Sequence, residues 1–258
     1  MNPVDFRTRK RVEKYRVYRI GSAEPIRMFR DQVAVEEPME IRMCQADAQS
    51  CQTIAVTMRT PGDDFHLAAG FLFTEGILQN PGEISRISYC VDPGLDGSQQ
   101  YNIVNVYLRP GVVIDESMLR RNFWVHSSCG VCGKASLEQL VARGCRPVES
   151  DVRVHPGVLA RLPERLRDSQ QVFERTGGVH AAGLFDEDGR LMFAAEDIGR
   201  HNAVDKVVGA SFLAGRLPAS TCMLQVSGRV SFEIIQKAAM AGIPIVSAVS
   251  APSSLAVE

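Results

Sequence analysis

The sequence predicts an α/β protein, with an α+β first half and a helix-covered sheet in the second half. Apolar and polar residues alternate along residues 33–58, which is the period of half-buried strands. Apolar runs at 221–226 and 243–249 flank a helical stretch at 231–241, which indicates a β-α-β unit with buried strands. A composition of 45% apolar and 23% charged residues, with a mean hydropathy of −0.06, excludes disordered, collagen-like and coiled-coil chains.

The chain carries no signal for a membrane or for secretion. Its longest apolar runs have the length of a strand, well below the ~20 residues of a membrane-spanning helix. The amino terminus has cations but neither an apolar block nor a small-residue cleavage site. We therefore expect a cytoplasmic protein without a membrane contact, whose seven cysteines are reduced thiols.

The first twenty residues form a basic segment on an acidic body. They hold seven cations against two carboxylates, a net charge of +5, whereas the whole chain has a net charge of −1. Such a segment is typical of a solvated arm or of a docking site for an acidic partner. We expect residues 1–20 to be a mobile arm that is dispensable for folding, and we expect no nucleic-acid partner.

Residues 21–126 are predicted to form an α+β domain. After the strands of 33–58, a helix is expected over about 61–79, with Thr60 as its N-cap and Pro61 at its first position. Alternation returns at 101–108, which predicts another strand. Three prolines, which lie between residues 147 and 163, mark the transition to the next domain.

Residues 151–258 are predicted to form a second domain, joined to the first by residues 127–150. Two apolar runs within 182–194 flank the turn sequence at 186–189 and predict a hairpin. A short helix through Val208, capped by Asn202, should follow before the β-α-β unit. Ser253 and Ser254 resemble the caps of one more helix.

The connecting segment contains a pair of cysteines three residues apart. Cys129 and Cys132 lie among small residues, with Lys134 close by. Two neighbouring thiols, a cation and glycine-loop N–H groups lower a thiol pKa from ~8.5 towards ~7. Exposed thiolates of this kind attack sulfur or disulfides, so the pair is a candidate sulfur-transfer site.

Other interpretations of this pair remain open. A thioredoxin-like redox pair is one, although such pairs usually sit at a tight strand-to-helix junction. A zinc deaminase is disfavoured because no His-x-Glu precedes the cysteines. A structural zinc site in a cofactor-binding chaperone is the main alternative. Its four ligands would be His126, Cys129, Cys132 and Cys145.

The remaining cysteines and two isolated histidines have ordinary structural interpretations. Cys44, Cys51, Cys90 and Cys222 lie in apolar patterns and are predicted to be inert core thiols. His66 and His155 have no companion residues that would make a site, and they too are predicted to be structural.

Polar residues also gather where strands of the second domain should end. In open α/β sheets, ligands bind at such ends, where helix N-termini and arginine side chains attract anions. The alternative is that these residues serve only as loop residues and salt-bridge partners of Asp197, Asp205 or Glu233. The candidate cofactor-binding residues are Thr176, His180, Arg200, His201, Ser227 and Arg229.

These motifs together resemble the formate dehydrogenase accessory sulfurtransferase family, also written FdhD/NarQ, over residues 33–258. The segments that carry the resemblance are Leu67–Phe71 with Thr74–Gly76, Ser128–Gly133, Thr176–Gly177 with His180–Ala182, Glu196–Lys206, and Ser227–Arg229 through Gln236–Lys237. The resemblance implies a cytoplasmic homodimer with a cytidine-deaminase-like α/β second half.

The same resemblance implies an enzyme, a sulfurtransferase. Sulfur would pass from a cysteine desulfurase to Cys129 as a persulfide, with Cys132 assisting. It would then pass to the molybdenum or tungsten bis-pterin guanine dinucleotide cofactor of the formate dehydrogenase catalytic subunit. GDP would mimic that cofactor, and no structural metal is expected. The family usually continues beyond Glu258 with a Gly- and Arg-containing stretch near the guanine dinucleotide site, so either the sequence is shortened or part of the cofactor pocket is absent.

Overall fold

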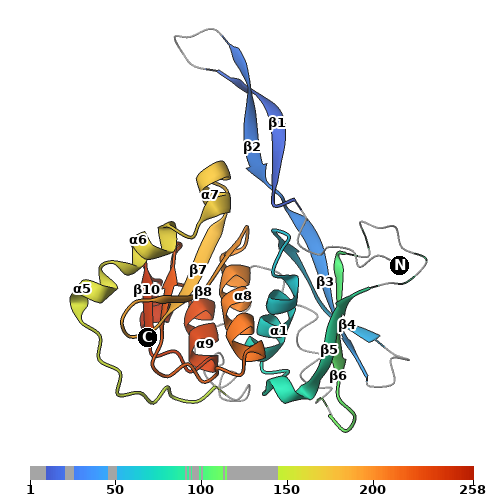
Figure 1. Ribbon diagram of the computed structural model, residues 1–258, viewed down its shortest axis with the longest axis vertical. Helices are drawn as coiled ribbons and strands as arrows, with labels where there is room; N and C mark the ends of the chain where they lie inside the picture. Colours follow the sequence, from blue (N-terminus) through green and yellow to red (C-terminus); the bar gives the residue numbers. More distant parts are fainter. Residues whose placement is uncertain are drawn as a thin grey trace.

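The computed structural model confirms the α/β class. It describes residues 10–20, 26–45, 51–90, 101–112 and 145–258, together with residues 92, 94, 99 and 114. The described elements form two four-stranded sheets, a two-stranded ribbon and helices that lie between and around the sheets (Figure 1).

The first sheet has the strand order β4-β3-β6-β5. Strand β3 pairs with β4 in antiparallel and with β6 in parallel orientation, and β5 pairs with β6 in antiparallel orientation. Core side chains such as Met39, Ile41 and Val104 are fully buried on one face. The strands are β3 (Glu37–Cys44), β4 (Cys51–Arg59), β5 (Ile84–Tyr89) and β6 (Ile103–Leu108).

The second sheet has the order β10-β9-β7-β8, and only β9 and β10 are parallel. The predicted hairpin is confirmed, as is the β-α-β unit in which helix α9 connects β9 to β10. The elements are β7 (His180–Phe185), β8 (Leu191–Asp197), α8 (Arg200–Leu213), β9 (Met223–Val226), α9 (Phe232–Met240) and β10 (Ile245–Ala248).

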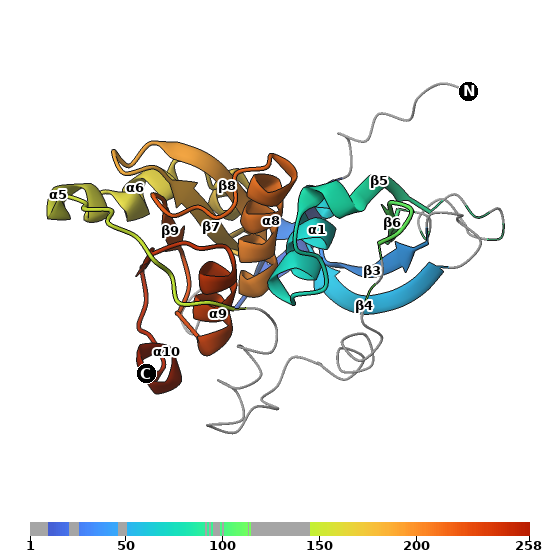
Figure 2. The same ribbon diagram turned by 90° about the horizontal axis from the view of Figure 1, so that it is seen from below.

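Helices α1 (Asp64–Thr74) and α8 lie side by side between the two sheets (Figures 1 and 2). One cluster of buried apolar residues includes side chains from both sheets and from both helices. Helix α6 (Leu162–Arg167) packs on the opposite face of the second sheet through Leu162 and Leu166. The second sheet is thus covered on both faces, while the predicted domain boundaries stay a prediction.

Short helices complete the described structure. Ser253 caps the last of them by accepting a hydrogen bond from the Ala256 N–H, as predicted. None of the helices in the described ranges is long and apolar enough to cross a bilayer. The short elements are the 3₁₀ turn η1 (Pro81–Glu83), α5 (Pro156–Leu159), α7 (Gln171–Thr176) and α10 (Ser254–Val257).

Helix α1 is shorter than the predicted helix over 61–79, and Thr60 is not its cap. The N-cap is Asp63, which has a left-handed backbone (φ 56°) and turns the chain into the helix. Thr60 instead accepts hydrogen bonds from the Ile198 N–H and from Lys206. The cap prediction failed because these partners lie more than 130 residues away along the chain.

The prediction of a mobile arm is wrong for residues 12–19. They form β1 (Val12–Arg19), which pairs along its whole length with β2 (Arg27–Ala34) in a ribbon that projects from the body (Figure 1). Arg11, next to the start of β1, connects the ribbon to the second sheet, since its side chain donates a hydrogen bond to the Glu196 carbonyl at 3.1 Å. Cross-strand pairing orders this basic segment, which composition alone could not show.

Two lysine–carboxylate pairs are buried around α8. Lys206 Nζ lies 2.8 Å from Asp197, and both side chains are fully buried. Lys237 Nζ donates to both Asp205 oxygens at 2.9 Å and to Thr74 of α1. Burial alone lowers the pKa of Lys237, but the Asp205 and Glu75 carboxylates more than reverse this effect, so its pKa is raised. These pairs connect α1, α8 and α9.

Substituting Lys237→Met should lower the free energy of unfolding by about 3–5 kcal/mol, because it leaves a buried Asp205 without its cation. Urea unfolding measures the change. The control is Arg190→Met, which breaks the exposed Arg190–Asp188 pair and should have little effect. Equal stability of the Lys237 and Arg190 variants would contradict the structural role of the Lys237–Asp205 pair.

Candidate functional site

The candidate site lies at one edge of the second sheet. The end of β8 and the start of β7 lie opposite each other there, because Asp197 pairs with His180. The end of β9 joins them, since the Ser227 N–H donates to the Ala181 carbonyl. The predicted meeting of strand ends is therefore confirmed for β8 and β9. His180 reaches the same edge as the first residue of an antiparallel strand.

Arg200 and His180 converge on the loop after β9. A Cβ atom on Gly228 would lie 3.2 Å from His180 Nδ1 and 4.0 Å from Arg200 Cδ, so the glycine leaves room for both side chains. Arg200 Nε is buried and has no hydrogen-bond partner among the described residues. A buried guanidinium N–H without an acceptor is costly. This atom is therefore suited to an anionic ligand.

Two helices begin at this edge. Gly199, which has no side chain to cap it, precedes α8, and Ser231 precedes α9 without a side-chain cap hydrogen bond. The N-terminus of a helix carries unpaired N–H groups and a partial positive charge. Together with Arg200, the two helix starts form an anion-binding edge of the sheet, which favours phosphate or pyrophosphate oxygens.

Helix α8 begins at Arg200, two residues before the predicted cap Asn202, and it runs to Leu213 instead of ending near Val208. Asn202 lies inside the helix. Its amide donates to the Met58 carbonyl and to Asp197, and so fixes α8 to β4. The partner in β4 lies 144 residues away, which explains why sequence reasoning assigned the wrong role to this side chain.

Both histidines at this anion-binding edge have lowered pKa values. Burial and then the Arg200 charge lower the pKa of His180. Burial, Arg200 and Lys237 lower the pKa of His201 to about 4, although Glu233 opposes this shift. Both imidazoles are neutral near neutral pH, so among the residues brought together here the positive charge comes from Arg200.

His201 also contacts the start of α9. Its Nε2 lies 3.2 Å from Ser231 Oγ and 3.9 Å from a Glu233 carboxylate oxygen. Burial raises the pKa of Glu233, but the hydrogen bond from Ser231, a backbone hydrogen bond and the charges of His201 and Arg200 together outweigh it, so the pKa is lowered. His201 and Glu233 thus form a neutral–anionic pair that links α8 to α9.

The stability of the protein should fall between about pH 7 and pH 5, in part because of His201. The unfolded imidazole has a pKa near 6.5 and binds a proton in this range, whereas the folded one, with a pKa of about 4, does not. Protonation therefore favours the unfolded chain. In His201→Gln, urea unfolding should show a smaller loss of stability on acidification. Parallel profiles for the two proteins below about pH 6.5 would refute this assignment.

The other predicted pocket residues occupy different positions. Ser227 Oγ accepts a hydrogen bond from the Ala181 N–H, so the hydroxyl holds the end of β9. Arg229 follows Gly228 and its side chain is exposed. Thr176 ends α7 and donates to the Val172 carbonyl. The prediction that it lies at the end of a strand is therefore wrong. The alternative salt-bridge role is not seen for Asp197 and Asp205, which pair with lysines.

The structure does not describe the predicted sulfur-transfer segment. Cys129 and Cys132 lie outside the described residues, as does His126 of the alternative zinc site. The fourth proposed zinc ligand, Cys145, is partly buried, and burial raises the pKa of its thiol. Within the described ranges, no group of three or more His, Cys, Asp or Glu side chains is arranged to hold a metal ion.

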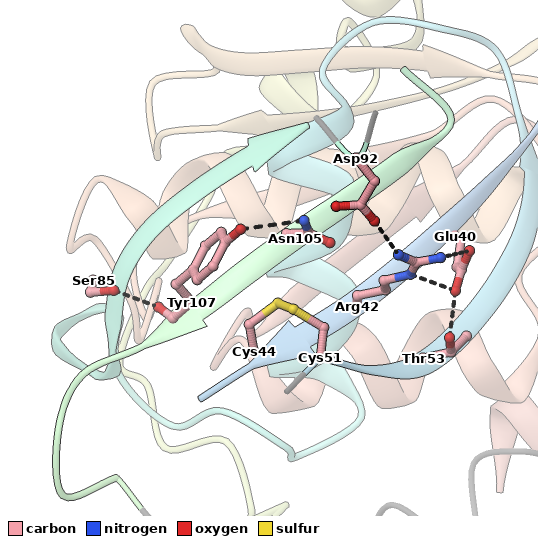
Figure 3. The surroundings of a disulfide bond; sticks show 9 residues. All are labelled: Glu40, Arg42, Cys44, Cys51, Thr53, Ser85, Asp92, Asn105 and Tyr107. Carbon is pink, nitrogen blue, oxygen red and sulfur yellow. Dashed lines mark hydrogen bonds and ion pairs between the residues drawn. A yellow bond between two sulfur atoms is a disulfide. The ribbon is translucent and has the colours of Figure 1, made fainter. Parts of the chain in front are cut away.

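The prediction of inert core thiols is wrong for one pair of cysteines. Cys44 and Cys51 form a disulfide between β3 and β4 (Figure 3), and Cys51 is exposed. Apolar neighbours suggested burial, but the two residues face each other across antiparallel strands. Cys90 and Cys222 are buried free thiols, as predicted.

Comparison with known proteins identifies relatives of the whole described fold. The family model described as the FdhD/NarQ family matches residues 34–258. The protein "Sulfur carrier protein FdhD" of Streptomyces avermitilis is 54% identical over 230 residues, covering 88% of this chain and 79% of that protein. The protein of the same name from Thermoplasma volcanium is 44% identical over 252 residues, covering 98% and 85%.

A solved structure shares the fold. The crystal structure of a candidate formate dehydrogenase accessory protein from Desulfotalea psychrophila superposes with a TM-score of 0.70 at 25% identity. The superposition covers 96% of this chain and 87% of that chain. Because the family model and close relatives match nearly the full length, the chain belongs to the FdhD/NarQ family.

Proposed function

We propose that this protein is a sulfur carrier that holds persulfide sulfur on Cys129. It would take the sulfur from a cysteine desulfurase and deliver it to the molybdenum or tungsten bis-pterin guanine dinucleotide cofactor of a formate dehydrogenase. The observation that carries the proposal is the close likeness to proteins named sulfur carriers, combined with the Cys129-Gly-Val-Cys132 sequence.

The proposed chemistry begins with transfer between cysteines. The Cys129 thiolate attacks the outer sulfur of the desulfurase persulfide, and the desulfurase cysteine leaves as a thiolate. This exchange moves one sulfur atom without any net oxidation. In the second step the Cys132 thiol attacks the inner sulfur of Cys129. The outer sulfur then leaves as hydrosulfide for the metal, and a Cys129–Cys132 disulfide remains.

The anion-binding edge of the second sheet supports the part of the proposal that concerns the substrate. A guanine dinucleotide carries a pyrophosphate, and the buried Arg200 Nε, the exposed Arg229 and the starts of α8 and α9 are groups that bind such anions. His180 and His201 are neutral, so their ring nitrogens can form hydrogen bonds with the ligand without adding positive charge. We propose that this edge of the sheet binds the dinucleotide portion of the substrate.

The cellular setting is part of the same proposal. A cytoplasmic homodimer would meet both the desulfurase and the formate dehydrogenase catalytic subunit before that subunit is complete. Each delivery of sulfur leaves a Cys129–Cys132 disulfide. Repeated transfer therefore requires a reducing compartment in which this disulfide is reduced again.

Mass spectrometry of the protein after incubation with cysteine desulfurase and cysteine tests the sulfur-carrier proposal. The expected result is an adduct with the mass of one sulfur atom, located on the peptide that contains Cys129 and removed by dithiothreitol. A protein that takes up no sulfur and contains one zinc ion per chain would overturn the proposal in favour of the cofactor-binding chaperone.

The affinity for GDP should depend more on Arg200 than on Arg229. Arg200→Gln is expected to weaken binding by about 1.5–3 kcal/mol, the value of a charge-assisted hydrogen bond. Arg229→Gln should cost less because its exposed side chain is better solvated. Isothermal titration calorimetry measures both, with Arg190→Gln in the β7–β8 turn as the control. An Arg200 variant that binds GDP like the parent would exclude Arg200 from the binding site.

A further inference from the structure

The disulfide between Cys44 and Cys51 joins a central strand to an edge strand. The two residues are register partners in the β3–β4 pair, and their Cα atoms are 4.1 Å apart. Strand β3 lies between β4 and β6, whereas β4 is the outermost strand of the sheet. The S–S bond therefore runs across the sheet, from the interior towards its edge (Figure 3).

The two sulfur-bearing residues differ in exposure. Cys44 has no exposed surface, while Cys51 is exposed. A thiolate attacks a disulfide along the line of the S–S bond, from the side opposite the leaving sulfur, and the rate depends on access. An in-line approach to Cys51 comes from beyond the edge strand. The corresponding approach to Cys44 comes over β6.

On the side of β6, Cys44 has a large aromatic neighbour. Tyr107 is the register partner of Cys44 on β6, and residues paired in this way lie on the same face of the sheet. The Arg86 guanidinium lies 3.9 Å from the centre of the Tyr107 ring and covers it. Because Cys44 has no exposed surface and lies beside this pair, an attacking thiolate has poor access to its sulfur, and Cys51 is the accessible end of the disulfide.

The strands remain paired without the disulfide. Thr53 of β4 donates to the Glu40 carboxylate of β3, next to the cysteines (Figure 3). Glu40 also accepts two hydrogen bonds from Arg42, at 2.8 and 3.0 Å. Backbone pairing of β3 and β4 continues as far as Glu37 and Arg59. The two thiols would thus stay opposite each other after reduction and could close again.

We propose that Cys44 and Cys51 form a reversible thiol-exchange site for low-mass thiols, with Cys51 as the sulfur that is attacked. A thiolate RS⁻ bonds to Cys51 Sγ, the S–S bond breaks, and Cys44 leaves as a thiolate that takes up a proton. A second thiolate then attacks the RS sulfur, which releases RSSR and the Cys51 thiolate. The disulfide gains two electrons and two thiols are oxidised.

Closure follows the reverse path. The Cys51 thiolate attacks a low-mass disulfide RSSR and releases RS⁻, and Cys44 then displaces the second RS⁻ from Cys51. This site is independent of the sulfur-carrier proposal, since it involves neither Cys129 nor Cys132. It is also distinct from Cys90 and Cys222, whose thiols are free and buried.

Treatment of the reduced full-length protein with oxidised glutathione tests the proposal. Trypsin places both cysteines on the peptide of residues 43–59, and fragmentation distinguishes them. In the parent protein the disulfide should re-form. In Cys44→Ser, glutathione should remain bound to Cys51. In the control Cys51→Ser, modification of the buried Cys44 should be at least about tenfold slower, because access limits exchange.

Circular dichroism verifies that each serine variant is folded before the reaction. Equal rates of modification at Cys44 and Cys51 in the two variants would overturn the assigned direction of attack. A folded parent protein in which both thiols stay free in oxidised glutathione would overturn the site itself. Neither result would affect sulfur loading on Cys129, which is measured on a different tryptic peptide.

Discussion

Cys129→Ser is expected to abolish persulfide loading and, with it, activation of formate dehydrogenase. Serine matches the size and polarity of cysteine, but its oxygen cannot accept the outer sulfur of a persulfide under these conditions. Cys132→Ser should retain part of the loading, because Cys132 assists or resolves and does not carry the sulfur. Mass spectrometry after reaction with the desulfurase measures loading, and the activity of co-expressed formate dehydrogenase measures delivery.

Cys145→Ser separates the sulfur carrier from the zinc alternative. In the sulfur carrier, Cys145 has no part in the transfer, so this variant should load sulfur like the parent. In a zinc site made by His126, Cys129, Cys132 and Cys145, loss of any ligand would release the metal and destabilise the fold by several kcal/mol. If all three serine variants lose zinc and unfold alike, Cys129 is a metal ligand and not a sulfur carrier.

The sequence predicted the strands that bury one or both faces. Alternation revealed β3 and β6, and a continuous apolar run revealed β9, because these patterns reflect local burial. The patterns also located β4 and β10, but Val56 and Met58 of β4 are exposed and β10 is only partly buried, so there they do not reflect burial. The β1–β2 ribbon escaped prediction because it is exposed on both faces. Residues such as Tyr15 and Tyr18 are more than half exposed, so no apolar–polar period marks the strand.

The candidate site was predicted only in part, because the sequence shows local patterns but not partners that are distant along the chain. Glycines and cations beside strand ends are visible in the sequence, and the structure brings His180, Arg200 and Gly228 together. The buried partners of Lys206 and Lys237 could not be predicted. A charged residue is expected to be exposed unless a buried partner is known. The partner Thr74 lies 163 residues from Lys237, so the sequence does not reveal it. The Cys44–Cys51 bond likewise depends on strand register.

The crossing of α1 and α8 is the other position where a small change should have a large effect. A Cβ atom on Gly70 would lie 1.9 Å from the Asp205 carbonyl oxygen, and one on Gly209 would lie 1.9 Å from the His66 carbonyl oxygen. Both obstacles are backbone atoms, which cannot rotate away as a side chain does. The two helices therefore touch backbone to backbone, and only glycine permits this distance.

Gly70→Ala and Gly209→Ala should each lower the free energy of unfolding by about 3–5 kcal/mol, the upper range for overpacked sites. The gain in helix propensity from glycine to alanine, ~1 kcal/mol, offsets only a small part. The added methyl group forces the helices apart and stretches the Thr74–Asp205 hydrogen bond, now 2.8 Å long. Urea unfolding measures the loss, and Gly178→Ala, whose Cβ would meet its nearest atom at 3.7 Å, is the control.

The double variant Gly70→Ala/Gly209→Ala decides whether the two glycines act at one crossing. Once the first methyl group has separated the helices, the second enters space that is already open, so its additional cost should be small. The double variant should thus be clearly more stable than the sum of the single effects implies, as expected for residues in contact. If the two losses simply add, the glycines act independently, and the close contact of α1 with α8 is not what makes them necessary.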